Sequence, residues 1–219
     1  MISAHGWVFA DADQFMADEL HADGGYQAGH LRVALQYVTD WTCAVDCGAH
    51  VGTWAKPMSE QFGTVIAIEP SRDTFQALTE NMRTFGCANV ELHNVALGAE
   101  PGRVTMALDA KNTERQNAGG RYVQNAVNGS ASVPRITLDS LDLPSCGFLK
   151  IDAEGSEPLV LMGARKTLKR CRPIVLYENK TLWLRHGLSA VDPQTVLAQA
   201  GYRQLERASC DLIFGPVER

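Results

Sequence analysis

Three short apolar segments that alternate with two helical patterns constrain the fold of this chain more than any other feature. Residues 43–47, 64–70 and 90–97 have the length and composition of buried strands. Residues 53–63 and 71–86 lie between them; the second segment begins with a capping serine and ends with a glycine. Strands joined to helices by short connections form right-handed crossovers and a parallel sheet. The sequence therefore predicts an α/β fold.

The rest of the chain extends this alternation. Residues 147–152 and 173–178 predict two more parallel strands, with a helix over 156–171 between them. Residues 202–216 predict a closing hairpin. We find no internal repeat and no domain boundary, so a single domain over residues 1–219 is expected. Further elements are expected at 26–38 (helix), 102–108 (strand) and 192–201 (helix).

Two segments lack a periodic pattern. Residues 1–25 are acidic and irregular, and they are interpreted as an N-terminal extension. Residues 110–132 are polar and rich in glycine and asparagine. Because an aperiodic loop of this length inside a compact domain is usually functional or disordered, we interpret residues 110–132 as a lid loop.

The composition excludes some classes of protein. The chain has 20 Lys and Arg against 25 Asp and Glu, and this acidic balance argues against a general nucleic-acid binder, although a local basic patch stays compatible with it. Six cysteines without a C-x-x-C pair do not form a disulfide framework. No secretory signal pattern and no membrane-spanning apolar run is present. A cytoplasmic protein without a membrane partner is expected, and its oligomeric state stays open.

The stretch "VDCGAHVGTW", residues 45–54, joins the first predicted strand to its helix and contains Gly48 and Gly52. A glycine-rich turn at this place is where nucleotide-like ligands bind, and we interpret the glycines as room for close approach of such a ligand. His50 stands where a dinucleotide site has its pyrophosphate glycine, and the Lys-Ser/Thr pair of a phosphate-binding loop is missing. The expected ligand therefore has no pyrophosphate.

A carboxylate supports a nucleoside ligand. Glu69 ends the second strand, 21 residues after Gly48, where a carboxylate pairs with ribose hydroxyls. Asp46 at the end of the first strand could meet a cationic group. S-adenosylmethionine carries a ribose, an ammonium and a sulfonium but no phosphate, so it fits these residues. The alternative is a plain strand–helix turn beside a solvated Glu69.

The block "KIDAEGSE" at residues 150–157 combines a lysine with several carboxylates. Lys150 interrupts a central strand that should be apolar, and a buried ammonium is costly unless it is paired. Asp152, Asp46 and Glu178 are its candidate partners. A structural ion pair and a catalytic role are both compatible with Lys150.

Asp152 lies at the carboxyl end of a strand beside the first one, where this architecture places its crevice. We interpret Asp152 as a catalytic base or a substrate-orienting residue, tuned by Lys150 and Glu178. Asp152, Glu154 and Glu178 could also gather Mg²⁺ through their oxygens. Acidic clusters also arise from helix capping, so Mg²⁺ is not favoured and no metal ligand is assigned.

These motifs resemble the FkbM-type S-adenosylmethionine-dependent methyltransferases. The resemblance covers about residues 25–180 and rests on "VDCGAHVGTW", "IAIEPS", "NVALG", "LDSL" followed by "LKIDAEGSE", and "VLYEN". His50 departs from the family, which commonly has asparagine there. The resemblance implies a class I methyltransferase fold: a Rossmann-like, seven-stranded, mostly parallel sheet with helices on both faces. It also implies O-methylation of a hydroxyl on a sugar or natural-product-like acceptor.

The resemblance also implies positions for the cofactor, S-adenosyl-L-methionine. Glu69 would hold the ribose. The methionine end of the cofactor would be lined by Asp46, Gly48, His50, Gly52 and Thr53. The adenine would be lined by Asn94, Val95 and Ala96.

Two other functions are compatible with the sequence. An RNA ribose 2′-O-methyltransferase would use lysine, aspartate and glutamate in its pocket, but the acidic balance and the lack of a Lys/Arg run argue against it. A cofactor-binding regulatory protein without turnover is the second alternative, and the carboxylates in the predicted crevice argue against that class.

Overall fold

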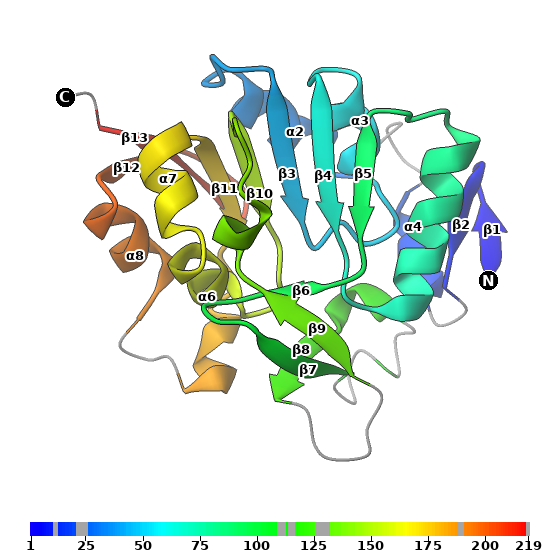
Figure 1. Ribbon diagram of the computed structural model, residues 1–219. Coiled ribbons are helices and arrows are strands. Elements are labelled where there is room, and N and C mark those ends of the chain that lie inside the picture. Colours follow the sequence, from blue (N-terminus) through cyan, green and yellow to red (C-terminus); the bar gives the residue numbers. More distant parts are fainter. Residues whose placement is uncertain are drawn as a thin grey trace.

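A seven-stranded sheet forms the centre of the protein (Figure 1). The computed structural model describes residues 1–10, 13–20, 26–108, 113, 117–125, 132–187 and 191–217. The strand order is β12-β13-β11-β10-β3-β4-β5, and β13 runs antiparallel to both of its neighbours. The predicted seven-stranded, mostly parallel sheet is confirmed. Its strands are β3 (Cys43–Cys47), β4 (Thr64–Ile68), β5 (Val90–His93), β10 (Phe148–Ile151), β11 (Ile174–Glu178), β12 (Tyr202–Ala208) and β13 (Asp211–Pro216).

The chain reverses its direction of progress across the sheet between β3 and β10. From β3 it proceeds to β4 and β5 on one side, and it later returns to β10 and β11 on the other side. Ligands of open α/β sheets bind at such a reversal, outside the carboxyl ends of the strands. The topology therefore predicts a ligand site at the carboxyl ends of β3 and β10.

Helices cover both faces of the sheet, as predicted. One apolar core joins Ala44 and Val65 to Leu78 and Met82, and a second core joins Val45 and other strand residues to the opposite helices. Neighbouring residues of β3 thus face different cores, because side chains alternate along a strand. The helices are α2 (Ala28–Leu35), α3 (Ala55–Ser59) and α4 (Arg72–Thr84) on one face, and α6 (Glu157–Met162), α7 (Arg165–Cys171) and α8 (Pro193–Gln199) on the other.

The helix expected over residues 156–171 is divided into α6 and α7 at Gly163. A Cβ atom on Gly163 would overlap the main-chain carbonyl of Gly98. This close approach requires glycine where a continuous helix would be favoured by the pattern alone. Among the described residues, no helix has both the length and the apolar character needed to cross a membrane.

A second sheet of four strands lies beyond the arrowheads of β3, β4 and β5 (Figure 1). The prediction of a single strand over residues 90–97 is wrong: residues 90–93 form β5 of the large sheet, whereas residues 96–97 form β6 of this small sheet. Asn94 causes the separation, because its Nδ2 donates to the carbonyls of Glu69 (2.8 Å) and Pro70 (3.2 Å). The small sheet has the order β6-β9-β7-β8, with β6 (Ala96–Leu97), β7 (Gly102–Ala107), β8 (Tyr122–Asn125) and β9 (Val133–Ile136).

The segment 110–132, interpreted as an irregular lid loop, contains regular structure in its described part. A 3₁₀ turn at Ala118–Gly120 leads into β8, which pairs antiparallel with β7 through contacts such as Thr105 with Gln124. Residues 122–125 form a strand because they pair with β7, and the polar composition of the segment did not predict this pairing. Residues 109–112, 114–116 and 126–131 of this region lie outside the described residues.

The N-terminal extension also contains regular structure where an irregular segment was expected. Strands β1 (Ile2–Ala4) and β2 (Trp7–Phe9) form a hairpin, and α1 (Gln14–Glu19) follows. Asn81 of α4 is fully buried and binds the hairpin: its Oδ1 accepts from Val8 N at 2.7 Å, and its Nδ2 donates to Val8 O at 2.8 Å. The hairpin is therefore docked by a long-range contact. Residues 11–12 and 21–25 lie outside the described residues.

Candidate functional site

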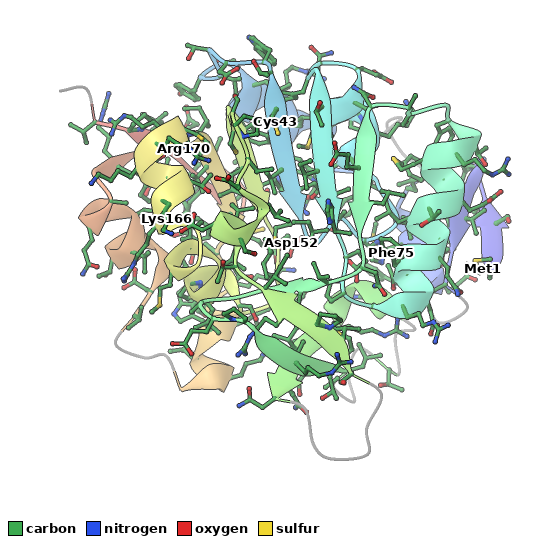
Figure 2. The ribbon with its side chains drawn as sticks, viewed as in Figure 1. Met1, Cys43, Phe75, Asp152, Lys166 and Arg170 are labelled. Atoms are coloured by element: carbon green, nitrogen blue, oxygen red, sulfur yellow. The ribbon has the colours of Figure 1, made fainter. Side chains whose placement is uncertain are left out.

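A cavity of about 460 Å³ lies at the carboxyl ends of the central strands, beside the small sheet. Its volume is in the range of small-molecule sites. Asp152, at the end of β10, lies near the small sheet in Figure 2. The cavity is lined by most of the predicted site residues, namely Gly48, His50, Thr53, Glu69, Val95, Ala96, Lys150 and Asp152. The other predicted site residues, Asp46, Gly52, Asn94 and Glu178, are not among the residues that line it.

The two glycines of the turn after β3 accommodate the protein's own atoms. Gly48 has φ +78°, and a Cβ there would overlap the main-chain carbonyl of Asp152. A Cβ on Gly52 would lie 2.5 Å from Met82 Cε and 2.9 Å from Leu78 Cδ1. Both positions therefore require glycine for a reason that the sequence did not show: the turn packs closely against β10 and α4. The interpretation that the glycines also make room for a ligand stays a prediction.

Glu69 joins the turns that follow β3 and β4. Its Oε2 accepts from His50 N at 3.0 Å, and its Oε1 accepts from Ser71 N at 2.8 Å. Burial raises the pKa of the Glu69 carboxyl, against the lowering effect of His50 and of these two N–H groups. Each carboxylate oxygen has a second lone pair, so Glu69 can also accept from a ligand hydroxyl in the cavity.

Lys150 is paired with Asp46, one of its three predicted candidate partners. Lys150 Nζ lies 3.1 Å from Asp46 Oδ1 and donates to the Gly48 carbonyl at 2.8 Å. Both side chains are buried. Burial lowers the pKa of Lys150, but the charges of Asp46 and Asp152 outweigh this effect and raise it. The ammonium therefore stays protonated near neutral pH, where it can hold the turn but cannot act as a base.

Three carboxylates gather where β10 and β11 end. Oxygens of Asp152, Glu154 and Glu178 lie within 4.8 Å of one another, and Lys180 Nζ lies 2.7 Å from Glu178 Oε1. Burial and, after it, the negative charge of Asp152 raise the pKa of Glu154 to about 7 and that of Glu178 to about 8. Glu154 and Glu178 are thus partly protonated near neutral pH, and Asp152 is the charged group that raises both values.

This carboxylate group has two chemical uses. Asp152 and Glu154 line the cavity and can exchange a proton with a bound molecule. Oxygens at this spacing are also compatible with Mg²⁺. Lys180 already supplies a positive charge to Glu178, so the cluster has a compensating cation of its own and we assign no metal to it.

The N-terminal extension contributes a residue that sequence reasoning missed. His50 Nε2 lies 2.9 Å from Oδ2 of Asp13, and Asp13 is fully buried. Burial lowers the pKa of His50, but the hydrogen bond and charge of Asp13, with the charge of Glu69, raise it overall. No local pattern could identify Asp13, because only the docked hairpin brings it to His50. Residues that line the cavity and were missed by sequence reasoning include Phe15, Tyr26, Arg121, Val123, Lys180 and Arg185.

The His50–Asp13 pair should make stability depend on pH. The folded state raises the pKa of His50, so the pair stabilises the protein fully below the unfolded pKa of about 6.5 and loses this contribution as pH rises through the folded value. The wild type should therefore have a higher free energy of unfolding than His50→Asn, and this difference should be larger at about pH 6 than at about pH 9. Urea unfolding at both pH values measures this, and a constant difference would contradict the expectation.

Comparisons with known proteins agree with this architecture. Residues 46–203 match the Methyltransferase FkbM domain family. The hexuronic acid methyltransferase AglP of Haloferax volcanii is 26% identical over 149 residues, which are 67% of this chain and 59% of that protein. The methyltransferase FkbM of Methylobacillus flagellatus has a similar structure, with a TM-score of 0.51 and 19% identity over 80% of this chain and 43% of that chain. The precorrin-6y C5,15-methyltransferase of Geobacter metallireducens is similar over 95% of this chain and 96% of that chain, with a TM-score of 0.50 and 14% identity.

Proposed function

This chain belongs to the FkbM methyltransferase family, and on that premise we propose that it transfers a methyl group from S-adenosylmethionine to a hydroxyl of a saccharide or related small acceptor. The chain spans 59% of the length of the curated relative that it matches. That relative is named for methylation of a hexuronic acid, and this name supports a sugar as the acceptor.

The observation that carries the proposal is the position of Glu69 in the cavity wall. Its carboxylate offers acceptor lone pairs to ribose hydroxyls, and the apolar residues Ile68, Val95 and Leu97 line the same cavity beside it. An apolar surface of this kind suits an adenine ring. The residues present thus fit a nucleoside, and the turn after β3 matches neither the glycine spacing of a dinucleotide site nor a phosphate-binding loop.

Asp152 is proposed to act on the acceptor. When bound, S-adenosylmethionine supplies an electrophilic methyl group, and the acceptor oxygen forms a C–O bond as the C–S bond breaks. Asp152 orients the hydroxyl and accepts its proton. Lys150 holds the Gly48 carbonyl and thereby the turn that forms one wall of the cavity. Glu178, whose oxygens lie within 4.8 Å of those of Asp152, is proposed to help position Asp152 in the carboxylate cluster.

The region around β8 is proposed to cover the bound molecules. Asn117, Gly119, Arg121 and Val123 line the cavity from the small sheet side. Arg121 attaches this region to the start of α4, since its NH1 donates to Ser71 Oγ at 2.9 Å. These contacts support a role for residues 110–132 in enclosing the reaction.

Glu69→Gln should weaken S-adenosylhomocysteine binding by about 1–3 kcal/mol, because it removes one charged acceptor oxygen. Isothermal titration calorimetry gives this value directly. Glu91→Gln is the matched control: Glu91 is exposed on the neighbouring strand β5, and its replacement should leave the affinity unchanged. An equal affinity for the wild type and Glu69→Gln would contradict the assigned role of Glu69.

The function itself is tested by binding and turnover on the same preparation. S-adenosylhomocysteine should bind and NAD should not, and methyl groups from labelled S-adenosylmethionine should appear on saccharide acceptors. Tight binding of NAD with no binding of S-adenosylhomocysteine would overturn the proposed function.

A further inference from the structure

The cavity is lined by several basic side chains, and most of them are already bound to other groups of the protein. Lys150 and Lys180 are paired with carboxylates, as described above. Arg121 NH1 donates to the hydroxyls of Ser71 (2.9 Å) and Thr74 (3.3 Å). The charges of Lys150 and Lys180 are therefore neutralised by carboxylates of the protein, and Arg121 already donates to two hydroxyls of the protein.

Arg185 differs from these cations. Its side chain is exposed and lines the cavity, and within the described part of the chain it makes no hydrogen bond and no ion pair. Its guanidinium carbon lies 4.4 Å from the centre of the Tyr122 ring. A guanidinium over a ring is attracted to the ring face and keeps N–H groups free to donate. Arg185 is thus an exposed cation beside an aromatic ring, with donors free for a ligand at the cavity.

Arg185 shares the cavity with the proposed reaction centre. Arg185, Glu154 and Asp152 all line it, and oxygens of Glu154 and Asp152 lie within 4.8 Å of each other. A group held by Arg185 would therefore belong to a molecule in the same cavity as the hydroxyl that Asp152 receives. Arg121 also lines this cavity, but it contacts the start of α4.

We propose that Arg185 binds a carboxylate of the acceptor, so that the acceptor is a uronic acid or a similar carboxylated saccharide. This inference rests on the proposed methyl transfer to a saccharide. The planar guanidinium donates two parallel N–H bonds to a carboxylate. A phosphate would bring about two negative charges into the cavity that Asp152 and Glu154 line, where Arg185 is the uncommitted cation among the described lining residues, and this favours the singly charged carboxylate.

Three sugars that differ at one carbon test this inference. Glucuronic acid, glucose and glucose 6-phosphate carry a carboxylate, a neutral group and a phosphate, respectively, at the same position. Their binding to the protein saturated with S-adenosylhomocysteine is measured by calorimetry. The wild type should bind glucuronic acid about 10- to 100-fold more tightly than glucose, the range expected of a hydrogen-bonded charge pair.

Arg185→Gln should abolish the preference for glucuronic acid and leave the affinity for S-adenosylhomocysteine unchanged. Arg203→Gln is the matched control, since Arg203 is exposed on β12 at the far edge of the sheet and should leave the preference unchanged. Arg185→Lys should keep part of the preference, because it retains the charge without the planar pair of donors.

Several results would overturn the inference while the proposed function stands. One is equal binding of glucuronic acid and glucose by the wild type, or no binding of either sugar. Another is stronger binding of glucose 6-phosphate, which would assign Arg185 to a phosphate. A third is a loss of S-adenosylhomocysteine affinity in Arg185→Gln, which would assign Arg185 to the carboxylate of the cofactor. Failure of the wild type to bind S-adenosylhomocysteine would contradict the proposed function instead.

Discussion

Asp152→Asn is expected to lower the rate of methyl transfer by about 10²- to 10⁴-fold while S-adenosylhomocysteine binds almost as tightly as before. The carboxylate of Asp152 lies in the cavity, and its oxygens lie within 4.8 Å of those of Glu154 and Glu178. Asparagine keeps the size and one acceptor oxygen, so binding and folding should survive. It cannot accept the proton of the acceptor, so turnover should not.

The same variant separates three roles for Asp152. Turnover, S-adenosylhomocysteine affinity and melting temperature are measured on one preparation, with and without a chelator. A metal role would appear as activity of the wild type that a chelator abolishes and Mg²⁺ restores. A structural role would lower the melting temperature. Near-normal turnover of Asp152→Asn would remove Asp152 from the mechanism and make Glu154 or Glu178 the next candidate.

Glu154→Gln is the useful comparison for Asp152→Asn. Glu154 lines the same cavity, but its pKa of about 7 means that it is partly protonated near neutral pH. Replacing it should therefore reduce turnover less than replacing Asp152. Its removal should also weaken the dependence of turnover on pH around neutrality, because one titrating group near Asp152 is lost.

Lys150→Met should destabilise the protein by about 3–5 kcal/mol, because it leaves the buried carboxylate of Asp46 without its cation. Asp46 is fully buried and Lys150 is 3% exposed, so neither charge is solvated in the folded protein. The change also removes the donor that holds the Gly48 carbonyl. Urea unfolding of the wild type and the variant measures the loss.

Two further variants make this prediction specific to the buried pair. Lys56→Met removes the cation of the surface pair with Glu60, in which Lys56 Nζ lies 2.7 Å from Glu60 Oε1, and it should cost less than about 1 kcal/mol. The double variant Asp46→Asn with Lys150→Met should recover part of the lost stability, since no unpaired charge remains. Equal losses in Lys150→Met and Lys56→Met would contradict a buried ion pair at this position.

Local patterns predicted most of the large sheet and its helices. The apolar strands, the helix after Ser71 and the closing hairpin are confirmed, because each leaves an apolar or periodic pattern in its own segment. The predicted serine cap is wrong, since the Ser71 side chain makes no capping hydrogen bond and its Oγ accepts from Thr74 Oγ1 at 3.0 Å and from Arg121 NH1 at 2.9 Å. The family resemblance then supplied the expected strand number, which the structure bears out. Glu69 and Asp152 could be placed at the cavity from sequence, since the carboxyl ends of parallel strands meet at one edge of a sheet.

The tertiary structure decided the features that depend on contacts between distant segments. Pairing with β7 makes residues 122–125 a strand, and docking on Asn81 orders the N-terminal hairpin, so neither could be read from local composition. The same docking brings Asp13 to His50. Each of these contacts joins two segments that are distant in sequence, and neither segment contains a pattern that predicts the other as its partner.

Sequence determined which residue types stand at the ends of the strands, and the tertiary structure decided what each of them touches. The spacing identified Lys150 as a buried cation that needs a partner, but Asp46, Asp152 and Glu178 were equivalent choices until the register of β3 beside β10 set Lys150 opposite Asp46. Gly48 was identified as a position of close approach, yet the approaching group is the carbonyl of Asp152. The physical reason is the same for Lys150 and Gly48. The local sequence shows that each residue must have a close neighbour, whereas only the packing of distant segments decides which group that neighbour is.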